Sequence, residues 1–234
     1  MKTQNIITLE DYLKTSDHSQ SDLETIRQGS PEELGGLINV FDATTGRQLL
    51  ANRRNKVLLR GRTFALENLF KDTVPTSTSG YPYTSLDRKI NSFRVGVGGT
   101  PTNDIMSPTN VVPTDEGLTA QVPFQEGVAS PTPELLALYC DVYQDPNTEL
   151  YTFNGKKFDE VDPPFIFDKS SNKVCKKLSL RINAQDVRDQ PISELALYFS
   201  ADDYSQAEIY SKVHFPTEPF SGVKELLFEY WTFA

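Results

Sequence analysis

The sequence predicts a mainly β protein: an antiparallel β-sandwich of jelly-roll type, with one short helix and an extended N-terminal arm. Apolar and polar residues alternate in several short runs, and segments rich in Gly and Pro separate these runs. In the body of the chain, one stretch of about ten residues places its apolar residues at helical spacing. We therefore expect an arm over residues 1–35 and a single β-sandwich domain over residues 36–234.

The composition is that of a soluble globular protein with its own core. The chain of 234 residues is 38% hydrophobic and 24% charged, with a formal net charge of −9. No apolar run is long enough for a transmembrane helix, and the polar, acidic N-terminus is unlike a signal peptide, so we expect folding in a cytoplasm without a membrane partner. Cys140 and Cys175 lack the spacing of a metal site, so we expect small, buried, free thiols.

The N-terminal arm carries two short helical patterns. Thr8 is followed three residues later by Asp11, which is the spacing of a capping box, and residues 21–28 place Leu23 and Ile26 on one side of a second turn of helix. Neither pattern is apolar enough to bury much surface alone. We expect the arm to be mobile or to become ordered by packing on a neighbouring subunit.

A hairpin and a helix are predicted next. Residues 37–41 and 48–50 are apolar runs joined by a loop that contains glycine, which is typical of two antiparallel strands. Residues 57–59 continue as a strand. Apolar residues then recur at helical spacing over residues 62–71, the single helix expected in the domain.

Two long loops are expected in the middle of the chain. Six prolines interrupt the region 98–135, which argues against a helix there and against a central strand. The region 143–173 is predicted as a second loop that contains short strands, with Asn154-Gly155 as a turn. Long loops of this kind are generally functional or ordered by a partner.

The remaining strands follow from alternation and from β-rich composition. Residues 93–97, 136–142, 150–153, 164–167 and 174–182 are strand candidates.

The last three candidates lie at close spacing, at residues 192–200, 207–215 and 223–233, and we expect them to be neighbours in one sheet. Residues 223–233 are apolar on both faces toward their end. This final strand is therefore expected to lie centrally in its sheet or to face a partner.

Charge is unevenly distributed, and this predicts contact between copies of the chain. Residues 47–62 contain six basic residues and no acid, whereas residues 95–155 contain eight acids and no Lys or Arg. Patches of opposite sign suit head-to-tail assembly. In the alternative interpretation these charges are solvated and neutralise one another within the monomer. The candidate interface residues are Arg47, Arg53, Arg54, Arg60, Arg62, Asp104, Asp115 and Glu116.

No set of residues predicts catalysis or cofactor binding. His18 and His214 have no acid or nucleophile at a catalytic spacing, and the acids at 159–162 and 202–203 lack the pattern of a calcium loop. The glycines of residues 96–100 lack the Gly-Lys-Ser/Thr ending of a phosphate-binding loop. A sequence pI near 4.8 argues against a dedicated nucleic-acid binder. We therefore expect no enzyme and no cofactor, although a pair of acids for hydrolysis has no sequence spacing that excludes it.

Six short motifs occur in an order that resembles a known group of proteins. They are Asp-Ala-Thr-Thr-Gly-Arg at 42–47, Asn-Lys-Val-Leu-Leu-Arg-Gly-Arg at 55–62, Phe-Arg-Val-Gly-Val-Gly-Gly-Thr-Pro at 93–101, Ile-Ser-Glu-Leu-Ala-Leu-Tyr at 192–198, Tyr-Ser-Lys-Val-His-Phe-Pro at 210–216 and Leu-Phe-Glu-Tyr-Trp-Thr-Phe at 227–233. This order resembles β-sandwich structural proteins of tailed bacteriophages, which are found in tails, baseplates, necks and collars. The likeness spans residues 36–234.

The resemblance implies a virion building block without an active site. Such a protein is assembled in the host cytoplasm, in several copies, and its partners are other copies of itself and other virion proteins. We expect the arm and the loops to make these contacts. The alternative hypothesis is a capsid decoration or a module that binds host carbohydrate, for which Tyr81, Tyr83, Tyr151 and Phe153 are candidate stacking residues.

Overall fold

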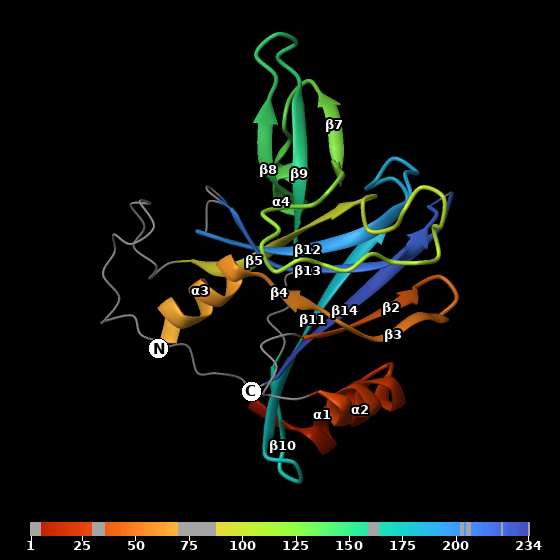
Figure 1. The fold of residues 1–234 in the computed structure, drawn as a ribbon, viewed down its shortest axis with the longest axis vertical. Coiled ribbons are helices and arrows are strands. Elements are labelled where there is room, and N and C mark those ends of the chain that lie inside the picture. Colours follow the sequence, from red (N-terminus) through yellow and green to blue (C-terminus); the bar gives the residue numbers. More distant parts are fainter. Residues whose placement is uncertain are drawn as a thin grey trace. The chain divides into compact units, whose positions relative to one another are not determined.

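The protein is mainly β, as the sequence predicts. A computed structural model describes residues 6–29, 36–69, 88–158, 164–201, 204, 207–220 and 222–233. Within these ranges the chain forms fourteen strands in two sheets, together with four helices (Figure 1). It divides into two compact units. The first unit takes Met1–Asn55, Phe158–Asn183 and Val223–Ala234, and the second takes Lys56–Lys157 and Ala184–Gly222.

The first unit is a six-stranded sheet with two helices. Only β1 and β10 pair in parallel, and every other described pair in this sheet is antiparallel. The strand order is β1 (Ile6–Thr8), β10 (Phe165–Asp168), β11 (Lys173–Asn183), β14 (Glu225–Phe233), β2 (Leu37–Asp42) and β3 (Gln48–Arg54), and the helices are α1 (Leu9–Thr15) and α2 (Ser19–Gln28).

The predicted hairpin of β2 and β3 is confirmed, and its turn has a clear local cause. The Asp42 carboxylate accepts hydrogen bonds from the backbone N–H groups of Thr44 and Thr45, at 3.0 and 3.1 Å. Gly46 follows with a φ of 72°, a left-handed conformation that favours glycine. The chain therefore reverses at this point and pairs Val40 with Leu50.

The N-terminal helices pack on the sheet of their own unit. Thr8 caps α1 by accepting a hydrogen bond from the Asp11 N–H, as the capping-box spacing predicts. In α2, Ile26 is buried in a cluster with Trp231, and the Tyr12 ring of α1 meets the Trp231 ring edge-on at 6.1 Å. The sequence predicted an arm that is mobile or ordered by a neighbour. Residues 6–28 are instead ordered by their own chain, because both short helices find apolar partners on this sheet.

A buried ionic cluster also holds α2 to the sheet. Lys177 of β11 places its Nζ 3.1 Å from Asp22 Oδ2 and 3.0 Å from Glu229 Oε1 of β14. The Tyr12 hydroxyl donates a hydrogen bond to Asp22 at 2.8 Å. Burial raises the pKa of Glu229 above its ordinary value, against the lowering effect of the Lys177 charge. One lysine thus forms ion pairs with two buried carboxyl groups.

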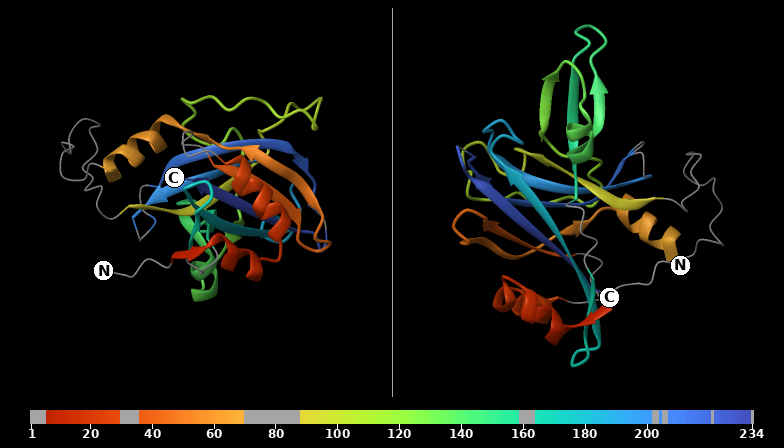
Figure 2. Two further views of the ribbon diagram at one scale, coloured as in Figure 1. Left: turned by 90° about the horizontal axis from the view of Figure 1, so that it is seen from below. Right: turned by 180° about the vertical axis from the view of Figure 1, so that it is seen from behind.

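The second unit is an eight-stranded sheet, shown from two further sides in Figure 2. Its main order is β4 (Lys56–Val57), β13 (Glu208–Glu218), β12 (Ile192–Ser200), β5 (Lys89–Gly96), β9 (Tyr151–Lys157) and β7 (Gln125–Val128). In addition, β6 (Gln121–Val122) pairs with β5 and β8 (Tyr139–Gln144) pairs with β9, and the helices are α3 (Leu59–Leu69) and α4 (Pro133–Leu138). The helix predicted over residues 62–71 is α3, which begins three residues earlier.

Aromatic side chains fill the core of the second unit. Phe93, Phe124 and Phe153 are fully buried, and the rings of Phe93 and Phe124 meet edge-on at 5.6 Å. Phe153 is therefore not available to stack on a sugar. Tyr151 is half-buried, and Tyr81 and Tyr83 lie outside the described residues. Cys140 of this unit and Cys175 of the first unit are buried and free, as predicted.

Two local predictions were wrong. Residues 136–142 were expected to form one strand, but α4 ends at Leu138 and β8 starts at Tyr139. The helix forms because Thr132 caps it by accepting from the Leu135 N–H, and because proline is tolerated in the first turn of a helix. Asn154-Gly155 lies inside β9 rather than in a turn. A Cβ at Gly155 would stand 2.9 Å from Cys140 Sγ, so close strand packing explains this glycine.

Longer-range expectations also need correction. The predicted loop over residues 143–173 contains all of β9 and β10, which include the short strands expected there at residues 150–153 and 164–167. Among the helices of the described residues, α1 and α2 correspond to the helical patterns of the arm and α3 to the helix of the domain, whereas α4 was not predicted. The last three strands are not neighbours in one sheet: β12 and β13 pair in the second unit, whereas β14 lies between β11 and β2 in the first. The central position of β14 is as predicted. The sandwich arrangement, the jelly-roll topology and a single domain over residues 36–234 stay predictions.

Candidate functional site

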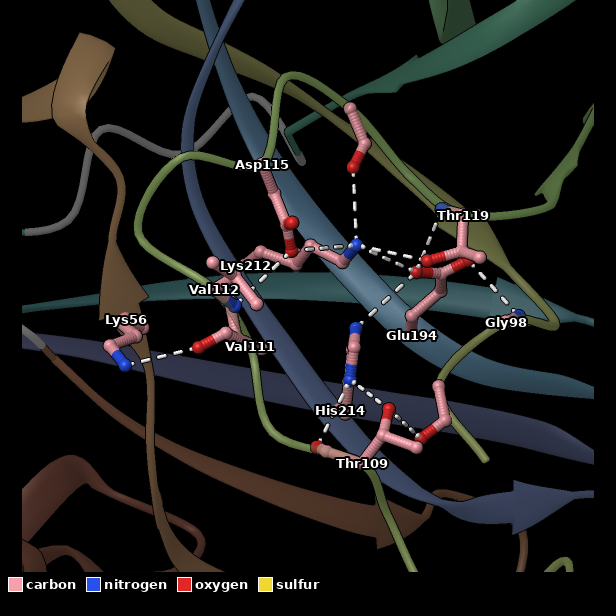
Figure 3. A network of polar contacts seen from close by, with 12 residues as sticks. Lys56, Gly98, Thr109, Val111, Val112, Asp115, Thr119, Glu194, Lys212 and His214 are labelled. Carbon is pink, nitrogen blue, oxygen red and sulfur yellow. Dashed lines mark hydrogen bonds and ion pairs between the residues drawn. The ribbon is translucent and has the colours of Figure 1, made fainter. Parts of the chain in front are cut away.

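The most distinctive local feature of the second unit is the segment 97–120, called here the anchored loop. It connects β5 to β6 and contains neither helix nor strand over its length. A network of buried polar side chains on β12 and β13 binds it (Figure 3). The anchored loop covers most of the predicted proline-rich loop over residues 98–135. It is therefore bound by side chains of its own unit.

Glu194 of β12 binds both ends of the anchored loop. Its Oε1 accepts hydrogen bonds from the N–H groups of Gly98 and Ala120, both at 3.0 Å, and its Oε2 accepts one from Thr119 at 3.1 Å. Glu194 lies opposite Gly96 in the pairing of β12 with β5, so its side chain emerges where the loop begins. One carboxylate thereby fixes two backbone segments that are more than twenty residues apart.

The charge of Glu194 is retained inside the protein. The side chain is fully buried, and burial alone would raise its pKa from the ordinary value of 4.5. The imidazole of His214, the N–H groups of Ala120 and Thr119 and the positive charge of Lys212 outweigh this effect and lower the pKa to about 2. Glu194 is therefore an anion at neutral pH.

Lys212 of β13 supplies the opposing charge. Its Nζ lies 3.2 Å from Glu194 Oε2 and 3.3 Å from Asp115 Oδ2. It also donates to the Gly117 carbonyl at 3.1 Å and to Thr119 Oγ1 at 3.3 Å. With its side chain 2% exposed, this lysine is almost completely surrounded by acceptors, three of which belong to the anchored loop.

His214 and Thr217 hold the middle of the loop. His214 lies directly opposite Glu194 in the pairing of β12 with β13, and its Nε2 is 3.5 Å from Glu194 Oε2. Its Nδ1 lies 2.9 Å from the Thr109 hydroxyl. The Thr217 N–H donates to the Ile105 carbonyl at 2.8 Å. The loop is thus bound to β13 at two further points.

Gly99 allows the backbone of the loop to approach β12 closely. Its N–H donates to Ser193 Oγ at 2.9 Å, and a Cβ at this position would lie 2.0 Å from the Ser193 carbonyl oxygen. A larger residue does not fit without a shift of backbone. The glycines of residues 96–100 therefore serve chain packing.

The anchored loop presents apolar side chains on its outer surface. Ile105 and Met106 are 53% and 67% exposed, and Val97 and Val112 are also exposed. The buried network binds the backbone of this loop, and Asp104 and Glu116 are exposed acidic residues of the same loop. A surface of this kind suits binding to another protein better than catalysis, because the polar groups that support it are covered.

The buried network lacks the features of a reaction centre. Glu194, Lys212 and His214 are each at most 4% exposed, so a substrate does not reach them in this conformation. In the part of the chain that the structure describes, no group of three or more His, Cys, Asp or Glu residues is arranged to hold a metal ion. Over the same ranges no helix is long and apolar enough to cross a membrane.

The predicted interface residues fall into distinct environments. Arg60 pairs with Glu208 at 2.5 Å and lies 3.9 Å from Glu116, and Asp115 pairs with Lys212. These residues therefore have partners of opposite charge within their own unit. The others are exposed: Arg47, Arg53 and Arg54 in the first unit, and Arg62 and Asp104 in the second.

Sequence reasoning missed Glu194 and Lys212. For Glu194 a signal was present, because it is the one charged residue of β12, whose other residues are apolar or small. Lys212 gave a weaker signal, because β13 also contains Glu208, His214 and Glu218. Burial of every residue in β12 requires Glu194 to be paired inside the protein. A single charged residue in such a strand predicts a buried partner of opposite charge, but it does not indicate which segment of the chain supplies that partner.

No protein-family model, curated protein or solved structure matches the chain.

Proposed function

We propose that this protein is a non-enzymatic structural component of a tailed bacteriophage virion, in the tail, baseplate, neck or collar. It assembles in several copies in the host cytoplasm, and its fold is an antiparallel β-sandwich of jelly-roll type. The order of six motifs over residues 36–234 supports the phage assignment, and the mainly β architecture agrees with it.

The observation that carries the assembly role is the anchored loop. Ile105 and Met106 are adjacent and more than half exposed, on a segment that Glu194 and Lys212 fix from within. Isolated exposed apolar residues are ordinary, but two on a pre-ordered loop form a binding element whose ordering entropy is already lost before binding. Docking to another subunit covers them at little further conformational cost.

The N-terminal segment has a smaller part in this proposal than the sequence suggested. Residues 6–28 contact the chain's own first unit through Tyr12, Asp22 and Ile26. The contact with neighbouring subunits is therefore assigned to the loops.

The test compares the oligomeric state of the full chain with that of a loop variant. The Ile105→Ser/Met106→Ser double variant removes the exposed apolar groups and leaves the anchoring residues in place. Val223→Ser is the matched control, since Val223 is 88% exposed and lies in the other unit. Mass photometry and sedimentation velocity over a concentration series measure the assembly, and thermal unfolding checks the fold.

We expect the wild-type chain and the Val223→Ser control to form a discrete oligomer. The loop variant is expected to associate about tenfold more weakly, which corresponds to about 1.4 kcal/mol. A wild-type chain that stays monomeric up to its solubility limit contradicts the assembly role.

A further inference from the structure

A second surface of the second unit has the properties of a strand-pairing edge. In this unit β9 lies between β8 and β7: Phe153 of β9 pairs with Val142 of β8 on one side and with Gln125 of β7 on the other. Figure 1 shows these three strands, in green, extending away from β5 and β12. Among the described residues, no strand pairs with the outer edge of β8.

The edge of β8 is unusually apolar for one that faces solvent. Val142 and Tyr143 are exposed on β8, and Leu136 and Leu138 are exposed on the adjoining helix α4. Edge strands that remain free in solution usually carry lysine, proline or a short strand length that blocks pairing. The β8 sequence Tyr-Cys-Asp-Val-Tyr-Gln has neither lysine nor proline, and the charge of its one acidic residue, Asp141, is paired with Arg94 of the same chain. The strand therefore resembles an edge that another strand covers.

The same surface is acidic. Residues 133–151 contain four acids and no basic residue. Asp141 is paired with Arg94 at 3.0 Å. For Glu134, Asp145 and Glu149, no ion pair exists with any basic residue that the structure describes. A partner for this edge is accordingly expected to be basic.

The first unit of the chain offers an edge of the opposite charge. β3 is the last strand of its sheet and pairs only with β2 within the described ranges. Arg53 on β3 and Arg47 just before it are exposed, and residues 47–62 contain no acid. Ala51 is also exposed, so small and apolar contact surface accompanies the arginines.

We propose that β8 of one copy pairs with β3 of a second copy, so that the two sheets continue into each other. Backbone hydrogen bonds between two unpaired edges supply affinity, and the arginines opposite Glu134 and Glu149 fix orientation. Tyr143 is the central apolar anchor. Because the two edges differ, the contact is head-to-tail and generates a ring or a filament.

This inference rests on the proposed assembly of several copies and names the surfaces that join them. It also replaces part of the sequence-based interface. Asp115 and Glu116 were expected to form the acidic side, but they face Lys212 and Arg60 of the same chain. On the β8 surface only Asp141 is neutralised in this way, by Arg94, whereas Glu134, Asp145 and Glu149 have no such pair among the described residues.

Charge reversal on each edge of the full chain tests the pairing. The basic-edge variant is Arg47→Glu/Arg53→Glu and the acidic-edge variant is Glu134→Arg/Glu149→Arg. The matched control, Asp17→Arg/Arg27→Glu, reverses two exposed charges on the first unit outside both edges. Sedimentation velocity measures self-association of each variant and of an equimolar mixture of the two edge variants.

We expect each edge variant to lose about tenfold or more in self-association affinity, since attraction becomes repulsion at the junction. The mixture is expected to restore association, because Glu residues on one chain then meet Arg residues on the other. The control is expected to assemble like the wild type.

The outcomes separate this inference from the proposed function. If the wild type assembles and both edge variants assemble equally well, the pairing of β8 with β3 is wrong, while the assembly role stands. Loss of association in only one edge variant, or no recovery in the mixture, also overturns the pairing, since another surface or another partner then occupies the affected edge. A wild-type chain that never associates overturns both proposals.

Discussion

Replacing Glu194 by glutamine tests the physical basis of the anchored loop. The side chain keeps its size, but it loses its charge, and one of its two oxygens becomes a donor facing the N–H groups and the ammonium group that surround it. Lys212 is then buried without its closest counter-charge. Breaking a buried ion pair from one side typically costs about 3–5 kcal/mol, and we expect a loss of that size at neutral pH.

The pH dependence of stability gives a second, independent value for the free energy that the Glu194 charge contributes. The pKa of Glu194 falls from 4.5 to about 2 on folding. A difference of about 2.5 pKa units at about 1.4 kcal/mol per unit corresponds to about 3 kcal/mol. Because the folded-state pKa is the lower one, this stabilisation is complete above about pH 5.5 and is lost as the pH falls toward 2. By pH 3 about 2 kcal/mol of it is lost.

Urea unfolding at pH 7 and at pH 3 measures both effects. We expect the wild type to lose about 2 kcal/mol more than Glu194→Gln between these two pH values, since glutamine does not titrate. Hydrogen exchange is expected to be faster at the Gly98, Thr119 and Ala120 amides of the variant, because their acceptor is weakened. Glu116→Gln, at a side chain that is 83% exposed, is the control and is expected to change stability by less than about 0.5 kcal/mol. A Glu194→Gln variant within 1 kcal/mol of wild type, with the same pH dependence, refutes the argument.

Two further substitutions test other contacts. Gly99→Ala is expected to destabilise the protein by about 1–3 kcal/mol in thermal unfolding, because its Cβ meets the Ser193 carbonyl. Gly117→Ala is the control and is expected to be nearly neutral, because its Cβ would lie at an ordinary contact distance of 3.9 Å from the Tyr198 hydroxyl oxygen. Equal effects contradict the close approach of loop and strand. Lys177→Met leaves Asp22 and Glu229 buried without their cation and is expected to cost about 3–5 kcal/mol in urea unfolding, whereas Lys169→Met at an exposed position is expected to cost little. Stability of Lys177→Met equal to that of the control shows that the ionic cluster is not needed to hold α2.

Local structure was largely predictable from the sequence, whereas the pairing of distant strands into sheets was not. The cap of α1 at Thr8 and the hairpin of β2 and β3 depend on neighbouring residues, and both were found. The separation of β13 from β14 into different sheets depends on partners far away in the chain, which alternation does not reveal. α4 was missed because its few apolar residues read equally well as a strand.

The candidate site was predictable only in outline. The proline-rich region was recognised as a long loop, but its attachment through Glu194 depends on a strand that follows some seventy residues later. The charge of Asp115 was noticed, whereas its neutralisation by Lys212 becomes visible only when β13 is placed. Whether a charged residue lies at an exposed interface or in the core depends on how deeply it is buried, and only the whole fold determines this burial.

The position of β14 has a consequence for the order in which the polypeptide acquires structure. During synthesis, Lys56–Lys157 and Ala184–Gly222 leave the ribosome before Glu225–Phe233 does. Until β14 emerges, β11 and β2 each lack the strand that lies between them and pairs with both. One edge of β11 and one edge of β2 therefore stay unpaired until then. The sheet of the first unit is therefore completed by the last strand to be made, through pairing of β14 with β2 between residues about 190 positions apart, and contacts of such long range are slow to form.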